Sequence, residues 1–455
     1  MQVKQRLVFL KALFRDQDVA LSLRSRAVHS GAWIGAGFAV QKALQLGSNL
    51  ILTRLLFPEA FGLMALATVF LVGLAMFSDI GLKPAVIRDI RGDQAEFLNT
   101  AWTIQIARGI LICAIGAAIA YPISLVYEEP ILFPLLALLS ITAAISGFTS
   151  IAMATAERRL DFKRITIVQV LGQVISIGLL VTLVYFWRSV WALAVANIAS
   201  AAVVVAIGFA LLPRHRHRIA LDEDSVRSLI QFGRWILFST MATYVGGEGL
   251  RAIQAGFITP AEFGILAIAY TIAGIPNDLA MKLAGAIGLP VLAETYRASP
   301  QNGFTILRAL RKRTLAISVL LSSAVILLGE PLVEFLYDPR YHSAGRYLVA
   351  IAFANAISAV SAGYTSAVLA VGKASSYFFI IFLSAILRIV GVTVGFEIYG
   401  IVGMLYGVGV ANLAVVAFNW NVSHKIGLAD LRLDAIALIT IFFIQCISGF
   451  YTFWS

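Results

Sequence analysis

The chain has 455 residues, of which 60% are apolar and only 13% charged, and its mean hydropathy is +0.88. So little polar surface excludes a soluble globular protein. The net charge of +11 would suit a nucleic-acid-binding protein, but the distribution of the basic residues, given below, excludes that partner.

Apolar runs follow one another along the chain, each about as long as the ~20 residues that cross a bilayer. A basic segment, residues 1–27, precedes the first run, and a polar segment, residues 213–227, follows the sixth. The short run at 314–329 is expected to begin among the basic residues before it. The sequence therefore predicts an all-α polytopic membrane protein with about 13 transmembrane helices, at 28–53, 61–82, 99–121, 131–155, 165–186, 190–212, 229–253, 261–283, 314–329, 347–371, 376–396, 399–422 and 435–454.

Residues 31–67 recur at residues 233–269, with a constant offset of 202 and no gaps. Ten of the 37 positions are identical, and they include the pairs Trp33/Trp235, Pro58/Pro260 and Gly62/Gly264. Biased apolar composition cannot explain those matches, so the chain is a duplication. Six runs separate the copies, which gives parallel repeats related by an axis along the membrane normal, with a substrate site between them.

The basic residues sort to one side of the membrane. If the N-terminus is inside and the runs alternate, inner segments hold 25 of the 35 Lys and Arg, and outer loops hold only five. This bias is the positive-inside rule, so the positive charge reflects topology. The segment 213–227 then becomes a cytoplasmic linker, for which a solvated loop, a metal site and a lipid-headgroup contact are the alternatives.

Several segments resemble a known family: 53–62 (TRLLFPEAFG), 78–82 (SDIGL), 159–164 (RLDFKR), 191–193 (WAL) and 370–373 (AVGK). In this order and spacing they are similar to the polysaccharide transporter (Wzx-like oligosaccharide flippase) family of the multidrug/oligosaccharidyl-lipid/polysaccharide flippase superfamily. The Asp usual in the family's seventh helix is absent, and Glu248 and Gly249 lie near its place.

The resemblance implies two six-helix lobes around a central cavity that move by alternating access. We expect a cytoplasmic N-terminal segment at 1–27, an N-lobe at 28–212, the linker at 213–227, a C-lobe at 228–424 and a C-terminal helix within 425–455. The implied substrate is a polyprenyl-pyrophosphate-linked oligosaccharide, translocated across a bacterial inner membrane for polysaccharide biosynthesis.

Charged residues inside the apolar runs are the candidate site residues, because a basic side chain at mid-bilayer costs about 2.5–3.5 kcal/mol unless it has a partner or faces water. Lys42, Arg251 and Arg388 are the first candidates for binding an anionic headgroup, with Arg108 and Lys282 in reserve. Arg388 is expected to have nothing nearby in its span that could neutralise its charge. Glu248 and Asp278 are candidates for ion coupling, although the pairs Glu248/Arg251 and Asp278/Lys282 also have the spacing of local ion pairs.

A polar stripe lies beside Lys42: Gln41, Gln45 and Asn49 recur at every fourth residue. Gln169 and Gln173 repeat the pattern in the fifth run. Hydrogen bonds between packed helices and a hydrated cavity wall explain such stripes equally well. We predict that Gln41, Gln45 and Asn49 bind sugar or headgroup groups.

No enzyme constellation, metal spacing or cofactor motif accompanies these residues, so we predict a non-enzyme without cofactors. The expected partners are the lipid-linked oligosaccharide and membrane lipids, with a polysaccharide polymerase and glycosyltransferases as further candidates. A cation-coupled antiporter for small molecules, from the same superfamily, is the alternative function. Such sites favour buried carboxylates, whereas the charges expected here are mostly basic.

Overall fold

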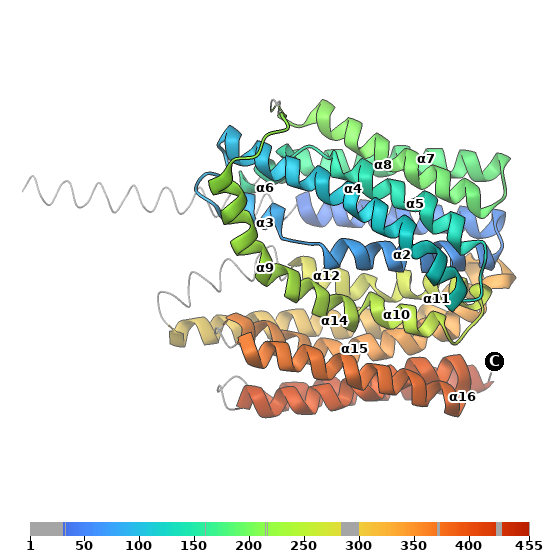
Figure 1. Cartoon of the computed structure of the whole chain (residues 1–455). Coiled ribbons are helices and arrows are strands. Elements are labelled where there is room, and N and C mark those ends of the chain that lie inside the picture. The colour runs from blue at the N-terminus through green and yellow to red at the C-terminus, as the bar shows by residue number, and fades with distance from the viewer. Residues whose placement is uncertain are drawn as a thin grey trace, which may run out of the picture.

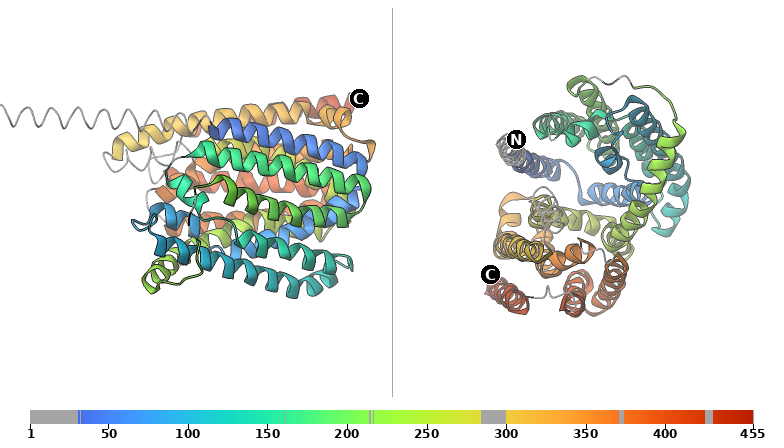
Figure 2. Two further views of the ribbon diagram at one scale, coloured as in Figure 1. Left: turned by 90° about the horizontal axis from the view of Figure 1, so that it is seen from above. Right: turned by 90° about the vertical axis from the view of Figure 1, so that its left-hand side faces the viewer.

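The computed structural model describes residue 31 and residues 33–454, apart from 160, 214, 216, 284–299, 371–373 and 425–429. Secondary structure in these residues is helical, and Figure 1 and Figure 2 show long helices packed side by side. In the first half of the chain, residues 33–55 form the first described helix. It is followed by α2 (Pro58–Phe77), α3 (Leu82–Arg88), α4 (Ala95–Val126), α5 (Leu132–Gly147), α6 (Ala152–Arg158), α7 (Phe162–Phe186) and α8 (Val190–Leu211).

In the second half, α16 covers two of the predicted membrane-spanning runs. A kink at Tyr399 and Gly400, whose backbone is not helical, separates the two runs. Gly400 has φ +57°, a left-handed conformation that favours glycine. The elements are α9 (Glu223–Gly246), α10 (Glu248–Ala255), α11 (Pro260–Ala273), α12 (Ile275–Leu283), α14 (Pro300–Leu336), the 3₁₀ turn η2 (Pro339–Tyr341), α15 (Ser343–Ala370), α16 (Ala374–His424) and α17 (Leu431–Trp454).

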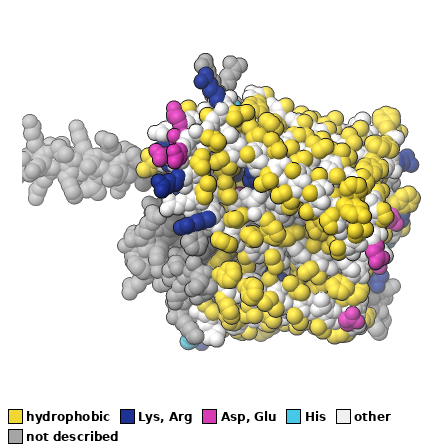
Figure 3. Space-filling model, in the orientation of Figure 1, with side chains coloured by type: hydrophobic (Ala, Val, Ile, Leu, Met, Phe, Trp, Pro, Cys, Tyr) yellow, Lys and Arg dark blue, Asp and Glu magenta, His cyan; other side chains and the backbone are white. Residues whose placement is uncertain are grey.

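Eight of the described helices are long and apolar enough to cross a membrane, or nine if the bent pair α5–α6 is counted as one span. In Figure 3 the charged side chains gather at the two ends of the molecule, with an apolar surface between them. The protein is therefore a polytopic α-helical membrane protein. Within the described residues each predicted run is mainly helical, while the number of spans stays a prediction. The predicted segment 1–27, residues 28–30 and 32 of the first run and residue 371 of the tenth run lie outside the described residues.

The two copies of the repeat meet where α2 packs on α11. Pro58 and Pro260 begin these helices, a position where the missing amide hydrogen costs nothing. Four residues later, a Cβ on Gly62 would lie 1.7 Å from the Pro260 carbonyl oxygen, and one on Gly264 would lie 2.0 Å from that of Pro58. Only glycine allows this reciprocal backbone contact.

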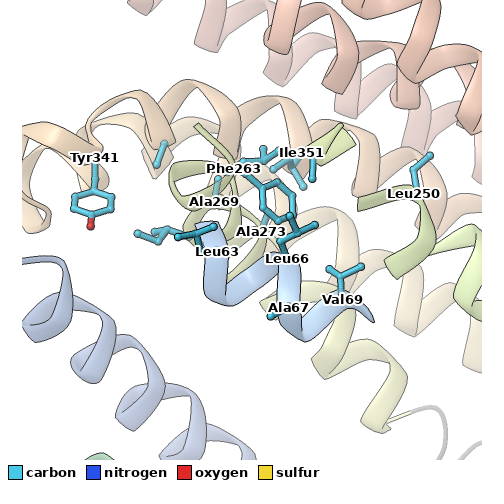
Figure 4. Packing of buried hydrophobic residues seen from close by; sticks show 14 of the residues in the cluster. Leu63, Leu66, Ala67, Val69, Leu250, Phe263, Ala269, Ala273, Tyr341 and Ile351 are labelled. Atoms are coloured by element: carbon cyan, nitrogen blue, oxygen red, sulfur yellow. The ribbon is translucent and has the colours of Figure 1, made fainter. Parts of the chain in front are cut away.

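Apolar packing continues from that contact into the largest core. Leu63 and Leu66 of α2 are buried with Phe263 of α11 and Ile351 of α15, as Figure 4 shows. At the same end as Pro58, two side chains next to α15 reach the first helix: Tyr341 Oη donates to the Leu56 carbonyl at 3.0 Å, and Arg340 donates to that of Thr53 at 3.2 Å. The halves are thus tied together at this end.

The described part of the linker is largely exposed, including residues 218–221. Arg218 N donates to Asn99 Oδ1 at 3.1 Å, and Asp222 N donates to Thr100 Oγ1 at 2.9 Å, so this segment lies along α4. The His217 ring packs 4.9 Å from Trp102. Among the described residues no group of three or more metal-ligating side chains exists, here or elsewhere. The described part of the linker is therefore an exposed loop that is hydrogen-bonded to α4.

Candidate substrate cavity

The first helix, residues 33–55, forms one wall of a cavity of about 510 Å³. Its side chains at 38, 41, 42 and 45 share one helical face and lie opposite α12. The cavity therefore lies between the two halves of the chain, as the duplication predicts for a substrate site. Its lining consists of Phe38, Gln41, Lys42, Gln45, Gln173, Asp278 and Lys282.

Lys42 and Asp278 form an ion pair across this cavity, with Nζ 2.8 Å from Oδ2. Lys42 also donates to Gln45 Oε1 at 3.3 Å. The spacing of Asp278 and Lys282 on α12 would allow a local ion pair, but the Asp278 carboxylate pairs with Lys42 on the other wall. The side chains of Lys42 and Asp278 keep 22% and 47% of their surface exposed, so water and a ligand can reach both.

A shared aromatic ring holds the two cations near each other. Lys42 Nζ lies 5.7 Å and Lys282 Nζ 4.7 Å from the ring centroid of Phe38, within the range of a cation–π interaction. Two ammonium groups and one carboxylate leave the lining with one net positive charge. The sequence argument missed Phe38, for which the only signal was its place four residues before Lys42.

The glutamines serve both functions that the sequence left open. Gln41 Nε2 donates to Gln169 Oε1 at 3.3 Å, and Gln173 Nε2 donates to the Gln41 carbonyl at 2.8 Å, so these residues join the first helix to α7. Gln41, Gln45 and Gln173 also line the cavity. Their remaining polar atoms are available to a ligand. Asn49, one turn beyond Gln45, is not part of the lining.

Arg251 and Glu248 lie outside this cavity and form the local ion pair that their spacing allows, with Nη1 2.9 Å from Oε1. The Arg251 guanidinium also lies 4.4 Å from the ring centroid of Tyr270. Tyr270 in turn donates its hydroxyl to Gln254 Oε1 at 2.7 Å. Both charges therefore have protein partners on α10 and α11.

Arg108 closes the end of α2. Its Nη2 donates to the Ala75 carbonyl at 2.5 Å, its Nε donates to Ser78 Oγ at 3.1 Å, and its Nη1 lies 3.8 Å from Asp79 Oδ1. A basic group is stabilised at a helix C-terminus, where carbonyls have no helical partner. Arg108 is not part of the cavity lining.

Arg388 has three uncharged hydrogen-bond acceptors, and none of them neutralises its charge. Its Nη1 donates to the Gly246 carbonyl at 3.0 Å, its Nε to Asn412 Oδ1 at 2.8 Å and its Nη2 to Ser358 Oγ at 3.3 Å. The Gly246 carbonyl ends α9, just where the chain breaks before α10. Arg388 therefore caps a broken helix, and its donors do not face the cavity.

Residues 51–344 match the family of polysaccharide biosynthesis proteins. Succinoglycan biosynthesis transport protein ExoT of Rhizobium meliloti (strain 1021) is 21% identical over 82% of this chain and 75% of its own length. Lipopolysaccharide biosynthesis protein WzxC of Escherichia coli (strain K12) is 21% identical over 56% of this chain and 52% of its own length. The multi-pass membrane protein described above thus belongs to the polysaccharide biosynthesis protein family, among the Wzx-like flippases.

Solved transporter structures share the fold. An inward-facing multidrug resistance MATE family transporter of the MOP superfamily superimposes with a TM-score of 0.68, at 13% identity over 87% of this chain and 95% of its own. An outward-facing one gives 0.56, at 14% identity over 92% and 96%. The inward closed lipid II flippase MurJ gives 0.60, at 12% identity over 94% and 98%. The fold is therefore one that transporters use.

Proposed function

We propose that this protein is a flippase that moves a polyprenyl-pyrophosphate-linked oligosaccharide from the inner to the outer leaflet of a bacterial inner membrane. The observation that carries the proposal is the interlobe cavity with Lys42, Lys282 and three glutamines in its lining. Phosphate oxygens need cations in a low-dielectric site, and sugar hydroxyls need amides.

The Lys42–Asp278 ion pair gives this site a way to respond to its ligand. A pyrophosphate carries more negative charge than one carboxylate, so it competes with Asp278 for Lys42. It also binds Lys282, which lies on α12 with Asp278. The cavity is within the volume range of small-molecule sites, about 300–1,000 Å³. In this conformation it accommodates the charged end of a headgroup rather than a whole oligosaccharide.

We further propose alternating access of an N-lobe, residues 28–212, and a C-lobe, residues 228–424, with about 13 spans in all. Two observations support an inward-facing state. The similarity is greater to the inward-facing transporter than to the outward-facing one. In addition, the contacts of Gly62, Gly264 and Tyr341 close the end that the charge distribution predicts to be outer.

A cation-coupled antiporter of small molecules is the second candidate, favoured by the carboxylate of Asp278 in the cavity. That carboxylate already binds Lys42, and the net charge of the lining is positive, which repels a cationic drug. The flippase therefore fits the same residues better.

Deletion of the gene tests the choice. In the flippase case lipid-linked oligosaccharide accumulates in the inner leaflet, while its synthesis continues and surface polymer is lost. A strain that makes normal polymer but becomes sensitive to toxic cations would replace the flippase with the antiporter. Restoration by the wild-type chain, and not by a Lys42→Met variant present at equal level, connects the phenotype to the cavity.

A further inference from the structure

A second cavity, of about 770 Å³, lies between the end of α3 and the first turns of α9. It shares no lining residue with the cavity at Lys42. The loop after α2 and the beginning of α9 both lie on the side that the positive-inside rule predicts to be cytoplasmic. The polar part of its lining is Arg88, Asp89, Arg91, Ser228 and Gln231.

The one carboxylate in this lining is already fully bound. Asp89 Oδ1 accepts the Arg91 backbone amide at 2.9 Å and the Arg91 Nε at 3.4 Å, and Oδ2 accepts the Ser228 hydroxyl at 2.9 Å. Burial alone would raise the pKa of Asp89, but these hydrogen bonds from Arg91 and Ser228 lower it below its ordinary value. Asp89 therefore stays charged and balances Arg91.

Arg88 has no carboxylate that neutralises its charge among the described residues. Its guanidinium lies 5.2 Å from the ring centroid of Phe232, and no carboxylate of the described residues lies within ion-pair distance of it. The side chain is exposed. The cavity thus contains one cation that an anionic ligand can use, already oriented by an aromatic ring.

Exposed apolar side chains also occur on the two segments that line this cavity. Ile90, between Arg88 and Arg91, is 92% exposed. Along α9, Ile230 and Phe238 are 56% and 61% exposed. An isoleucine so exposed beside arginines is typical of the interface between headgroups and acyl chains, because the apolar part enters the hydrocarbon while the charges meet phosphates.

The two walls of this cavity contact each other in this conformation. Beyond the Ser228–Asp89 bond, Thr240 Oγ1 donates to the Met76 carbonyl at 2.8 Å, and a Cβ on Gly233 would lie 2.5 Å from the Ile80 carbonyl oxygen. The α9 helix therefore packs on the first half of the chain in this conformation. The cavity lies between residues 88–91 of the proposed N-lobe and residues 228–232 of the proposed C-lobe, and it shares no lining residue with the cavity at Lys42.

We propose that this cavity binds one anionic glycerophospholipid of the inner leaflet, with the phosphate on Arg88 and an acyl chain along the exposed Ile90. The net charge of one on the lining suits a single phosphodiester better than a pyrophosphate. The bound lipid fastens α3 to α9 at the bilayer surface. This site is separate from the substrate cavity and does not depend on what the protein transports.

The test uses the full-length protein in nanodiscs of phosphatidylcholine, with and without phosphatidylglycerol. Thermal unfolding gives the midpoint, and native mass spectrometry gives the number of phosphatidylglycerol molecules that stay bound. The variants are Arg88→Gln, Arg88→Lys and Arg227→Gln. Arg227 is a matched control because it is an exposed arginine of α9 outside the lining.

Phosphatidylglycerol should raise the midpoint of the wild type and of Arg227→Gln equally, because a ligand that binds only the folded state stabilises it. Arg88→Gln should lose at least half of that rise and one bound lipid, with an unchanged midpoint in pure phosphatidylcholine, and Arg88→Lys should keep part of it. An equal loss in both glutamine variants would mean diffuse surface attraction and overturn the proposal. So would an equal rise with inorganic phosphate alone, or an unchanged rise in Arg88→Gln.

Discussion

The first helix and the pair α9–α10 are two copies of one ancestral segment, yet the structure uses them differently. Residues 33–55 form one continuous helix, which packs on α7 of its own half and lines the cavity. At the same repeat positions, α9 and α10 are separated by a break at Gly247. The α9 helix also packs on the other half of the chain.

Single positions show how the copies diverged. The offset of 202 pairs Lys42 with Tyr244 and Gln45 with Gly247. Lys42 faces the cavity, whereas Tyr244 is buried and donates its hydroxyl to the Val69 carbonyl at 3.4 Å. The polar stripe of one copy has thus become a packing face in the other. In our proposal, one copy therefore provides ligand contacts, while the other packs the two halves together.

Removal of the Lys42 charge should have the largest effect on export, because Lys42 is the cation that the repeat contributes to the cavity lining. Lys282 lies beyond the end of the second copy at residue 269. We expect Lys42→Met, which keeps the length of the side chain, to lower export about a hundredfold, or roughly 2.8 kcal/mol of lost binding. Lys42→Arg should keep part of the activity, since the headgroup needs charge. Export of surface polymer by a deletion strain carrying each variant is the measurement.

Lys163→Met is the matched control for that prediction. Lys163 lies at the beginning of α7, 5.7 Å from the ring centroid of Trp33 and outside the cavity lining. It should export normally at equal protein level. If Lys42→Met also exports normally while correctly inserted, the ammonium only joins the two walls through Asp278, and the first copy would be structural like the second.

Substitution of Gly62 or Gly264, which form the contact between the two copies, should have the next largest effect. The loss of stability should be similar for the two glycines. Gly62→Ala and Gly264→Ala each place a methyl group against a backbone carbonyl that cannot move away. We expect each to lower the free energy of unfolding by about 2 kcal/mol, as overpacking does. Gly178→Ala, with nothing within 4 Å of the added Cβ, should not lower it. Thermal unfolding of the purified proteins measures this, and an effect in only one variant would argue against a symmetric contact.

The break in the second copy leads to a prediction about Arg388. Arg388→Met leaves three acceptors without their donor, among them the Gly246 carbonyl at the end of α9. The cost should be about 1–2 kcal/mol of unfolding free energy, since buried polar groups lose their partner. The apparent affinity for lipid-linked oligosaccharide should not change in the folded fraction. Unchanged stability with lost binding would instead make Arg388 a substrate contact.

The sequence predicted the parts of this molecule that repeat or follow a period. The matched Pro and Gly identified the segments that meet at α2 and α11, and the stripe at Gln41, Lys42 and Gln45 identified residues that share one cavity. Those positions are periodic, so one helix face can be read directly.

Partners far apart in sequence could not be predicted. Arg388 lies 142 residues from the carbonyl it binds, and that carbonyl is free only because the helix breaks there. Arg311, counted among the cytoplasmic cations, is buried in an ion pair with Asp434 of α17. No periodic pattern or motif in the sequence predicts either contact, because each contact depends on where two helices cross in the fold.

The smallest effect is expected at Arg251, the position that corresponds to Asn49 in the first copy. Its ion pair with Glu248 is partly exposed, with 36% and 29% of the two side chains accessible, and such pairs contribute about 0–1 kcal/mol. Arg251→Gln should therefore change the unfolding midpoint little and leave export near normal, since neither residue lines the cavity. Glu248→Gln should behave in the same way. Export assays in the deletion strain decide the matter: a loss in Arg251→Gln comparable to that in Lys42→Met would mean that the second copy also contacts the substrate, and that the two copies differ less than their packing indicates.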